Sequence, residues 1–233
     1  MLIKPAIPAA VGAVFLLVAG CSSGTPVAPP SVAPPSSSAP SATSAAGPYS
    51  AYTQSYTVPW VGSPDFAHLT STLKVEASVN GGAVSPFTVD TGSVGVVVPA
   101  SEVPNIPADS PPGSLTYSSS GLELTGVWVT ASVSFPQAVD ATGAAAGAQA
   151  EVPVLAVTSS TCRGGGGVNS GRCTGGAIPH MLGVGFGRGG NTARAAPTHN
   201  PFLNLAAMTA GGTMRRGYLI GRPGLSLGLT AAN

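Results

Sequence analysis

Short β-rich runs separated by glycine and proline make up most of the sequence that can build a hydrophobic core. Residues 73–79 alternate apolar and polar side chains, as a half-buried strand does, and the Asn-Gly-Gly after them predicts a turn. One short helix is predicted, with Asn200 as its cap and Pro201 in its first turn. Further strands are predicted at residues 87–89, 126–135, 152–157 and 217–220. The pattern therefore predicts an all-β domain with one short helix.

The amino terminus has the features of an export signal. Lys4 supplies a positive charge, and residues 6–18 are almost wholly apolar. This run is too short to span a membrane comfortably and suits the apolar region of a signal peptide. The small residues Ala19 and Gly20 then precede Cys21, an ending that resembles the lipobox of bacterial lipoproteins.

That resemblance implies a specific processing and location. Residues 1–20 would be removed as a lipoprotein signal peptide, and Cys21 would carry lipid, palmitate included. The protein would then be held through this lipid anchor on the extracytoplasmic face of the cell membrane. The alternative is an ordinary signal peptide with a chance cysteine.

The segment after the cysteine is predicted to be a disordered tether. Residues 22–48 consist of Ser, Pro, Ala, Thr, Gly and Val, without a charged or aromatic residue. Such a composition buries too little apolar surface to offset the entropy of ordering the chain. We therefore expect residues 21–53 to be a lipidated cysteine and its tether, and residues 54–233 to form one domain.

Charge is scarce and unevenly placed. The formal net charge is +1, all eight acids lie at or before Glu151, and seven arginines and no acid follow it. One interpretation is that the charged residues lie on solvated loops around a fold of low charge. The other is that the separation of acids from arginines along the chain favours self-association or an anionic partner. We expect no nucleic-acid partner.

Two cysteines remain for the domain once Cys21 is assigned to lipidation. Cys162 and Cys173 are separated by a glycine-rich segment, and in an exported protein they are expected to form a disulfide. No Cys or His pair stands at metal-ligand spacing, so we expect no metal and no cofactor. His180 and His199 are interpreted as loop or packing residues.

The residues that could carry chemistry lie in a strand–turn–strand segment at 87–99. An apolar run leads to Asp90, Thr91, Gly92 and Ser93, and a second apolar run ends in Val-Pro. This segment resembles the active-site segment of pepsin-like and retropepsin-like aspartic proteases. Val97 departs from the pepsins, which usually have tryptophan there. A capped turn aspartate on a hairpin is the alternative.

The resemblance assigns a role to each residue of the turn. Asp90 would be the catalytic carboxylate, and Thr91 would reach across a twofold axis to a partner loop. Gly92 would place an amide against the carboxylate, and Ser93 would hydrogen-bond its outer oxygen. The fold implied is an acid-protease lobe, a closed, barrel-like β domain.

Two further segments agree with this resemblance in order. Residues 180–187 resemble the apolar-apolar-Gly strand that crosses behind the catalytic loop. Residues 115–121 and 125–128 resemble the flap hairpin, which would place Tyr117 at the flap tyrosine, although Ser118 replaces the usual glycine. A tyrosine that serves only packing is the alternative.

The mechanism of these proteases requires two carboxylates that share one proton. The sequence has one Asp-Thr-Gly, and Asp65, Asp109 and Asp140 lack the Thr-Gly or Ser-Gly that would follow. The second carboxylate would come from a second copy in a homodimer or from a missing lobe. We therefore expect an aspartic endopeptidase that acts on peptide or protein substrates. A catalytically silent lobe that binds peptides or envelope partners is the alternative, and a structural lipoprotein is a more distant one.

Overall fold

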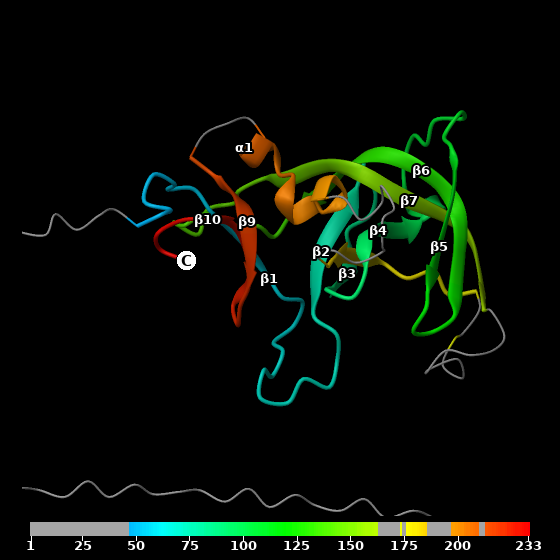
Figure 1. Cartoon of the computed structure of the whole chain (residues 1–233), viewed down its shortest axis with the longest axis horizontal. Coiled ribbons are helices and arrows are strands. Elements are labelled where there is room, and N and C mark those ends of the chain that lie inside the picture. Colours follow the sequence, from blue (N-terminus) through cyan, green and yellow to red (C-terminus); the bar gives the residue numbers. More distant parts are fainter. Residues whose placement is uncertain (1–46, 163–172, 174–175, 186–196, 210–212) are drawn as a thin grey trace, which may run out of the picture. The chain divides into compact units, whose positions relative to one another are not determined.

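The β-rich runs form two sheets (Figure 1). The computed structural model describes residues 47–162, 173, 176–185, 197–209 and 213–233. The smaller sheet has the strand order β1 (Tyr56–Pro59), β10 (Gly224–Leu229) and β9 (Arg215–Ile220). The larger has the order β2 (Lys74–Val79), β3 (Ser85–Asp90), β8 (Met181–Val184), β4 (Val94–Pro99), β7 (Ala148–Cys162), β6 (Leu122–Phe135) and β5 (Pro112–Tyr117). The predicted all-β class is confirmed.

The helical segments that the structure describes are short. They are η1 (Ala100–Glu102), η4 (Pro197–His199), η5 (Pro201–Leu203) and α1 (Ala206–Thr209). None of the helices in the described part of the chain has the length and apolar composition that crossing a membrane requires.

The predicted helix after Asn200 is interrupted. Its cap is present, because the Asn200 side chain accepts a hydrogen bond from the Phe202 amide at 2.9 Å. The helical turn then ends at Asn204, whose side-chain amide donates to the carbonyls of Pro197 and Asn200. The next residue, Leu205, forms a β-bridge instead, so two single turns replace the one predicted helix.

The closed barrel implied by the resemblance is not formed. β2 pairs with β3 over four residue pairs, and its last two residues pair with Ser134 and Val133 of β6. This contact curls the larger sheet at one corner. The larger sheet nevertheless ends in β5 beyond β6, and β1, β10 and β9 form a separate sheet whose strand β1 also bridges to Val139 through Thr57.

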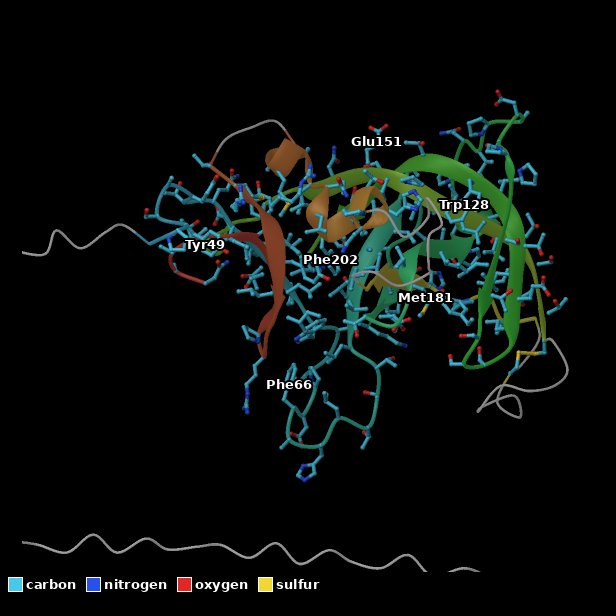
Figure 2. The ribbon with its side chains drawn as sticks, in the orientation of Figure 1. Tyr49, Phe66, Trp128, Glu151, Met181 and Phe202 are labelled. Atoms are coloured by element: carbon cyan, nitrogen blue, oxygen red, sulfur yellow. A yellow bond between two sulfur atoms is a disulfide. The ribbon has the colours of Figure 1, made fainter. Side chains whose placement is uncertain are left out.

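The main core is built by the inward-facing residues of the strands together with Phe202. In β6, Ala131, Val133 and Phe135 are buried between less buried serines, which is the period of two expected of a strand. Phe202, which Figure 2 labels, is fully buried. Its ring centroid lies 5.5 Å from that of Phe135 and 5.4 Å from that of Tyr218. These contacts join the larger sheet to β9.

One strand from late in the chain separates the two strands that flank the predicted catalytic turn. β8 is parallel to β3 and antiparallel to β4, and Gly183 is the register partner of both Asp90 and Gly95. A Cβ atom at position 183 would lie 2.6 Å from the Val94 nitrogen and 2.8 Å from the Ser93 carbonyl carbon. Glycine is therefore required here by the close approach of backbone to backbone.

We predict that Gly183→Ala lowers the free energy of unfolding by roughly 1–3 kcal/mol, because the added methyl forces the Ser93–Val94 backbone away. Gly221→Ala is the matched control, since its Cβ would come no closer than 3.6 Å to a neighbouring atom. Urea unfolding of the compact unit Ser44–Asn233 measures both. Equal effects of the two substitutions would contradict the packing described above.

Candidate active site

Asp90 is the last residue of β3, and its carboxylate is held by the turn that follows. The Gly92 amide donates a 2.7 Å hydrogen bond to Asp90 Oδ1. Asp90 is half-buried, whereas Thr91 and Gly92 are exposed. A carboxylate held in this way has a fixed orientation and remains accessible from solvent.

Tyr117 lies close to this carboxylate. Burial raises the pKa of the Tyr117 phenol, and the negative charge of Asp90 raises that pKa further. The Ser93 hydroxyl is near enough to Tyr117 to lower the pKa in part, although buried Ser93 Oγ makes no full hydrogen bond within the described residues. The three side chains thus form one group, although Tyr117 comes from a different part of the sequence.

The hairpin of β5 and β6 carries Tyr117 to this position. Tyr117 is the register partner of Leu122, and the Gly121 amide donates to the Tyr117 carbonyl at 2.8 Å to close the turn. The Tyr117 side chain packs on a second apolar cluster, which is separate from the main core. The buried members of that cluster are Val97, Leu124, Leu155 and Val157.

Partly buried apolar residues surround the same cluster. Ile178 packs on it from the segment that leads into β8, Met181 packs on it from β8 itself, and Trp128 packs on it from β6. Figure 2 labels Met181 and Trp128 in the part of the domain formed by the larger sheet. The surroundings of Tyr117 are therefore largely apolar, which accounts for the raised pKa of its phenol.

The described hydrogen bonds of four other acids do not lead to Asp90, so they supply no second carboxylate of the kind that the mechanism requires. Asp65 contacts His68, Glu76 accepts a bond from Gln137, and Asp140 accepts bonds from its own turn. Glu102 is bound to His180 and Ser85. Over the part of the chain that the structure describes, Asp90 is the acid that adjoins Tyr117.

The Glu102 cluster was not expected from the sequence. His180 Nε2 lies 2.9 Å from Glu102 Oε2, and Ser85 Oγ donates to the same oxygen at 3.1 Å. The His180 ring also packs edge-on against Phe87 with a centroid separation of 5.1 Å. These residues lie toward the start of β3, whereas Asp90 ends that strand, so the cluster ties η1 to β3 and β8.

The expected disulfide is confirmed. Cys162, the last residue of β7, is bonded to Cys173 with a Cα–Cα separation of 5.8 Å. Cys162 is also the register partner of Leu122, which in turn pairs with Tyr117. The disulfide is therefore attached to the strand that lies beside the end of the hairpin that carries the tyrosine.

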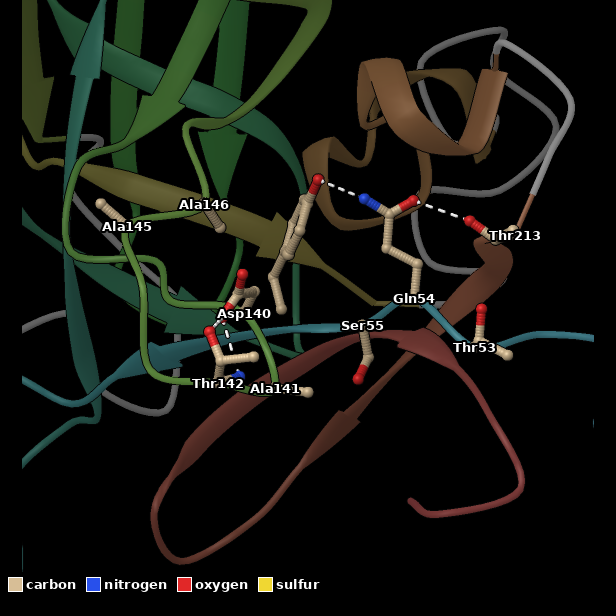
Figure 3. Close-up of a pocket in the computed structure, with 10 residues that line it drawn as sticks. Thr53, Gln54, Ser55, Asp140, Ala141, Thr142, Ala145, Ala146 and Thr213 are labelled. Atoms are coloured by element: carbon tan, nitrogen blue, oxygen red, sulfur yellow. Dashed lines mark hydrogen bonds between the residues drawn. The ribbon is translucent and has the colours of Figure 1, made fainter.

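A polar pocket of about 520 Å³, which the sequence did not reveal, is lined by residues from segments 53–56 and 140–146 and by Thr213. Figure 3 shows these lining residues. Asp140 Oδ1 accepts bonds from the Thr142 hydroxyl and from the amides of Thr142 and Ala144. The Thr142 hydrogen bonds hold the pKa of Asp140 below its usual value. Gln54 joins the Tyr56 hydroxyl to that of Thr213.

The remaining predicted site residue, Cys21, lies outside the described residues, as does the tether up to residue 46. Groups of three or more His, Cys, Asp or Glu side chains that could hold a metal ion are absent from the residues described. Neither a scan against models of known protein families nor a search of curated proteins found a match for the chain.

We predict that folding delays the ionisation of Tyr117 when the pH is raised. A pKa raised by folding means that the contribution of Tyr117 to stability is present below about pH 10 and is lost as the pH rises through its folded pKa. Ultraviolet absorbance, which reports phenolate formation, should show an ionisation at high pH that is absent from the Tyr117→Phe variant.

The Asp90 contribution to this effect can be isolated. Asp90→Asn removes a nearby negative charge, so the late titration should move to lower pH but remain late because burial is the larger cause. Asp109→Asn, an exposed acid elsewhere, is the control and should leave the titration unchanged. If the folded wild type and Tyr117→Phe show the same late part of the titration, Tyr117 does not occupy the described position.

Proposed function

We propose that the chain is an extracytoplasmic aspartic endopeptidase, anchored in the cell membrane through lipid on Cys21, with Asp90 as its catalytic carboxylate. The observation that carries the proposal is the group formed by Asp90, the Gly92 amide and Tyr117. An oriented, accessible carboxylate beside a hydroxyl on a hairpin supports the resemblance of the sequence to an acid-protease lobe. The placement of β8 between β3 and β4 supports it further.

The proposed chemistry uses two carboxylates with one proton between them. The ionised carboxylate takes a proton from water while the water oxygen bonds to the carbonyl carbon of the scissile peptide. The protonated carboxyl group gives its proton to the carbonyl oxygen. The tetrahedral intermediate then collapses and the C–N bond breaks. The leaving nitrogen receives the proton that the first carboxylate took from water, and a hydroxyl of the intermediate returns its proton to the second carboxylate.

One chain supplies one of these carboxylates, so the second is assigned to Asp90 of another copy. Like charges about 3 Å apart do not both ionise, which is why such a pair retains a proton in mildly acidic solution. Tyr117 would cover the substrate from its hairpin, and the apolar cluster beneath it would keep that side of the site dry.

A second candidate function is that of a catalytically silent lobe that binds peptides. The observation in its favour is the single carboxylate, because the described contacts bring no other acid to Asp90. The two candidates share the fold and the substrate class, and they differ in whether bound peptide is cleaved.

We predict that Ser44–Asn233 cleaves unfolded peptides and that Asp90→Asn reduces this activity by roughly 10²–10⁴-fold. Asparagine keeps the shape of the side chain but cannot exchange the proton. Asp109→Asn, at an exposed position, is the control and should retain full activity. Because each chain brings one Asp90, activity per chain should rise with protein concentration and then level off.

Two outcomes of this experiment decide between the candidates. Peptide binding without cleavage at any concentration favours the silent lobe. Turnover by Asp90→Asn equal to that of the wild type contradicts the assignment of Asp90 in either form of the enzyme.

The anchor is tested separately. We predict that the full chain incorporates radiolabelled fatty acid when expressed in bacteria and that Cys21→Ala abolishes this labelling, because the thiol is the acceptor. Ser22→Ala is the matched control and should be labelled like the wild type. A labelled Cys21→Ala protein would contradict the lipobox interpretation.

A further inference from the structure

We propose that the polar pocket beside Asp140 binds a neutral ligand rich in hydroxyl groups, and that the class of ligand is a short oligosaccharide. The volume of the pocket, about 520 Å³, is in the range of small-molecule sites. None of its lining residues belongs to the group formed by Asp90, Gly92 and Tyr117. The binding site is therefore separate from the proposed peptidase site.

Backbone hydrogen bonds fix the walls of the pocket. The amides of Thr53 and Gln54 both donate to the Thr213 carbonyl at 3.1 Å, which joins two parts of the wall that lie far apart in the sequence. Thr57 follows one lining segment and Val139 precedes another, and these two residues exchange backbone hydrogen bonds of 2.8 and 2.9 Å. The pocket is therefore preformed, as the sites of small ligands usually are.

The Asp140 carboxylate offers a hydrogen-bond acceptor to a ligand. Its Oδ1 atom accepts from the Thr142 hydroxyl and from the amides of Thr142 and Ala144, so the turn occupies this oxygen. Its Oδ2 atom makes no hydrogen bond within the described residues (Figure 3). The turn thus holds the carboxylate in one orientation and leaves one oxygen for the ligand.

Other lining side chains supply hydrogen-bond donors. Gln54 Nε2 donates to the Tyr56 hydroxyl at 2.8 Å, and the Thr213 hydroxyl donates to Gln54 Oε1 at 3.0 Å. Because the Tyr56 oxygen already accepts a hydrogen bond, the phenol proton remains for donation to a ligand, as far as the described residues show. The hydroxyls of Thr53 and Ser55 line the same pocket and can both donate and accept.

The chemistry of these groups selects the class of ligand. None of the lining residues drawn in Figure 3 is basic, so a phosphate or a carboxylate would meet Asp140 without a compensating charge. An ammonium group only donates hydrogen bonds and would leave the Tyr56 proton without an acceptor. A hydroxyl group both donates and accepts, so the hydroxyls of a sugar can donate to Asp140 and accept from Tyr56.

Nuclear magnetic resonance of Ser44–Asn233 tests the proposal with three neutral disaccharides, N,N′-diacetylchitobiose, cellobiose and maltose. At least one of them should shift the amide signals of segments 53–56 and 140–146 in a saturable way. Asp140→Asn keeps an oxygen for the turn but replaces the free oxygen by an amide group, so it should raise the dissociation constant about tenfold. Tyr56→Phe removes the phenol proton and should raise that constant about threefold.

Asp65→Asn is the matched control. Asp65 Oδ1 also accepts from a nearby backbone amide, that of Ala67, but Asp65 does not line the pocket. This substitution should leave the dissociation constant unchanged, and the amide spectrum of each variant establishes that it is folded.

Three results would overturn the proposal: no saturable shift with any of the disaccharides, shifts confined to residues away from the pocket, or equal dissociation constants for the wild type and Asp140→Asn. Methylammonium ions that shift the pocket signals at lower concentration than every disaccharide would also overturn it, because the ligand would then be a cation. The proposed function fails differently, through peptide cleavage by Asp90→Asn, which does not affect the pocket.

Discussion

The hydrogen bonds of β8 to both β3 and β4 are the constraint on which the candidate site depends. Gly183 stands opposite Asp90 on one side and Gly95 on the other, and the Gly185 amide donates to the Ser93 carbonyl at 2.8 Å. The turn that carries the carboxylate is therefore fixed at both ends by one strand. Preorganisation of this kind allows a short polar turn to hold a side chain in one orientation.

The position of Tyr117 has a different origin, in the pairing of the long strands β6 and β7. Leu122 links Tyr117 on one side to Cys162 on the other, so the disulfide and the hairpin share one register. The Tyr117 side chain packs against the apolar cluster that contains Leu124 and Leu155. Two separate constraints, one for Asp90 and one for Tyr117, thus meet where the two side chains interact.

Local patterns in the sequence predicted the parts of the fold that have a local cause. β2 and β6 follow from alternation of apolar and polar residues, and the Asn200 cap follows from its side chain. β1 has no such signal, because it has only four residues and ends in proline. One short helix is present as expected, but it is separated from the Asn200 cap at Asn204, whose side chain donates to backbone carbonyls. The closed barrel was wrong, because sheet closure depends on pairings between distant strands.

The candidate site also divides into features with a local cause in the sequence and features that depend on distant contacts. The Asp90 turn is recognisable from consecutive residues. The proximity of Tyr117 to Asp90 was implied only by a resemblance, because the two residues lie far apart in the sequence. The contact of Glu102 with His180 and the pocket at Asp140 join residues far apart in the chain and leave no spacing to detect. Such contacts arise from tertiary packing, which a single sequence does not encode in any local pattern.

The stoichiometry of inhibitor binding tests the central claim, that one Asp90 from each of two chains makes one site. Calorimetric titration of Ser44–Asn233 with pepstatin, a mimic of the transition state of aspartic proteases, should give one inhibitor bound per two chains. Asp90→Asn should abolish or strongly weaken that binding without dissociating the dimer. One inhibitor per chain, or no binding by a folded and dimeric wild type, would contradict the account.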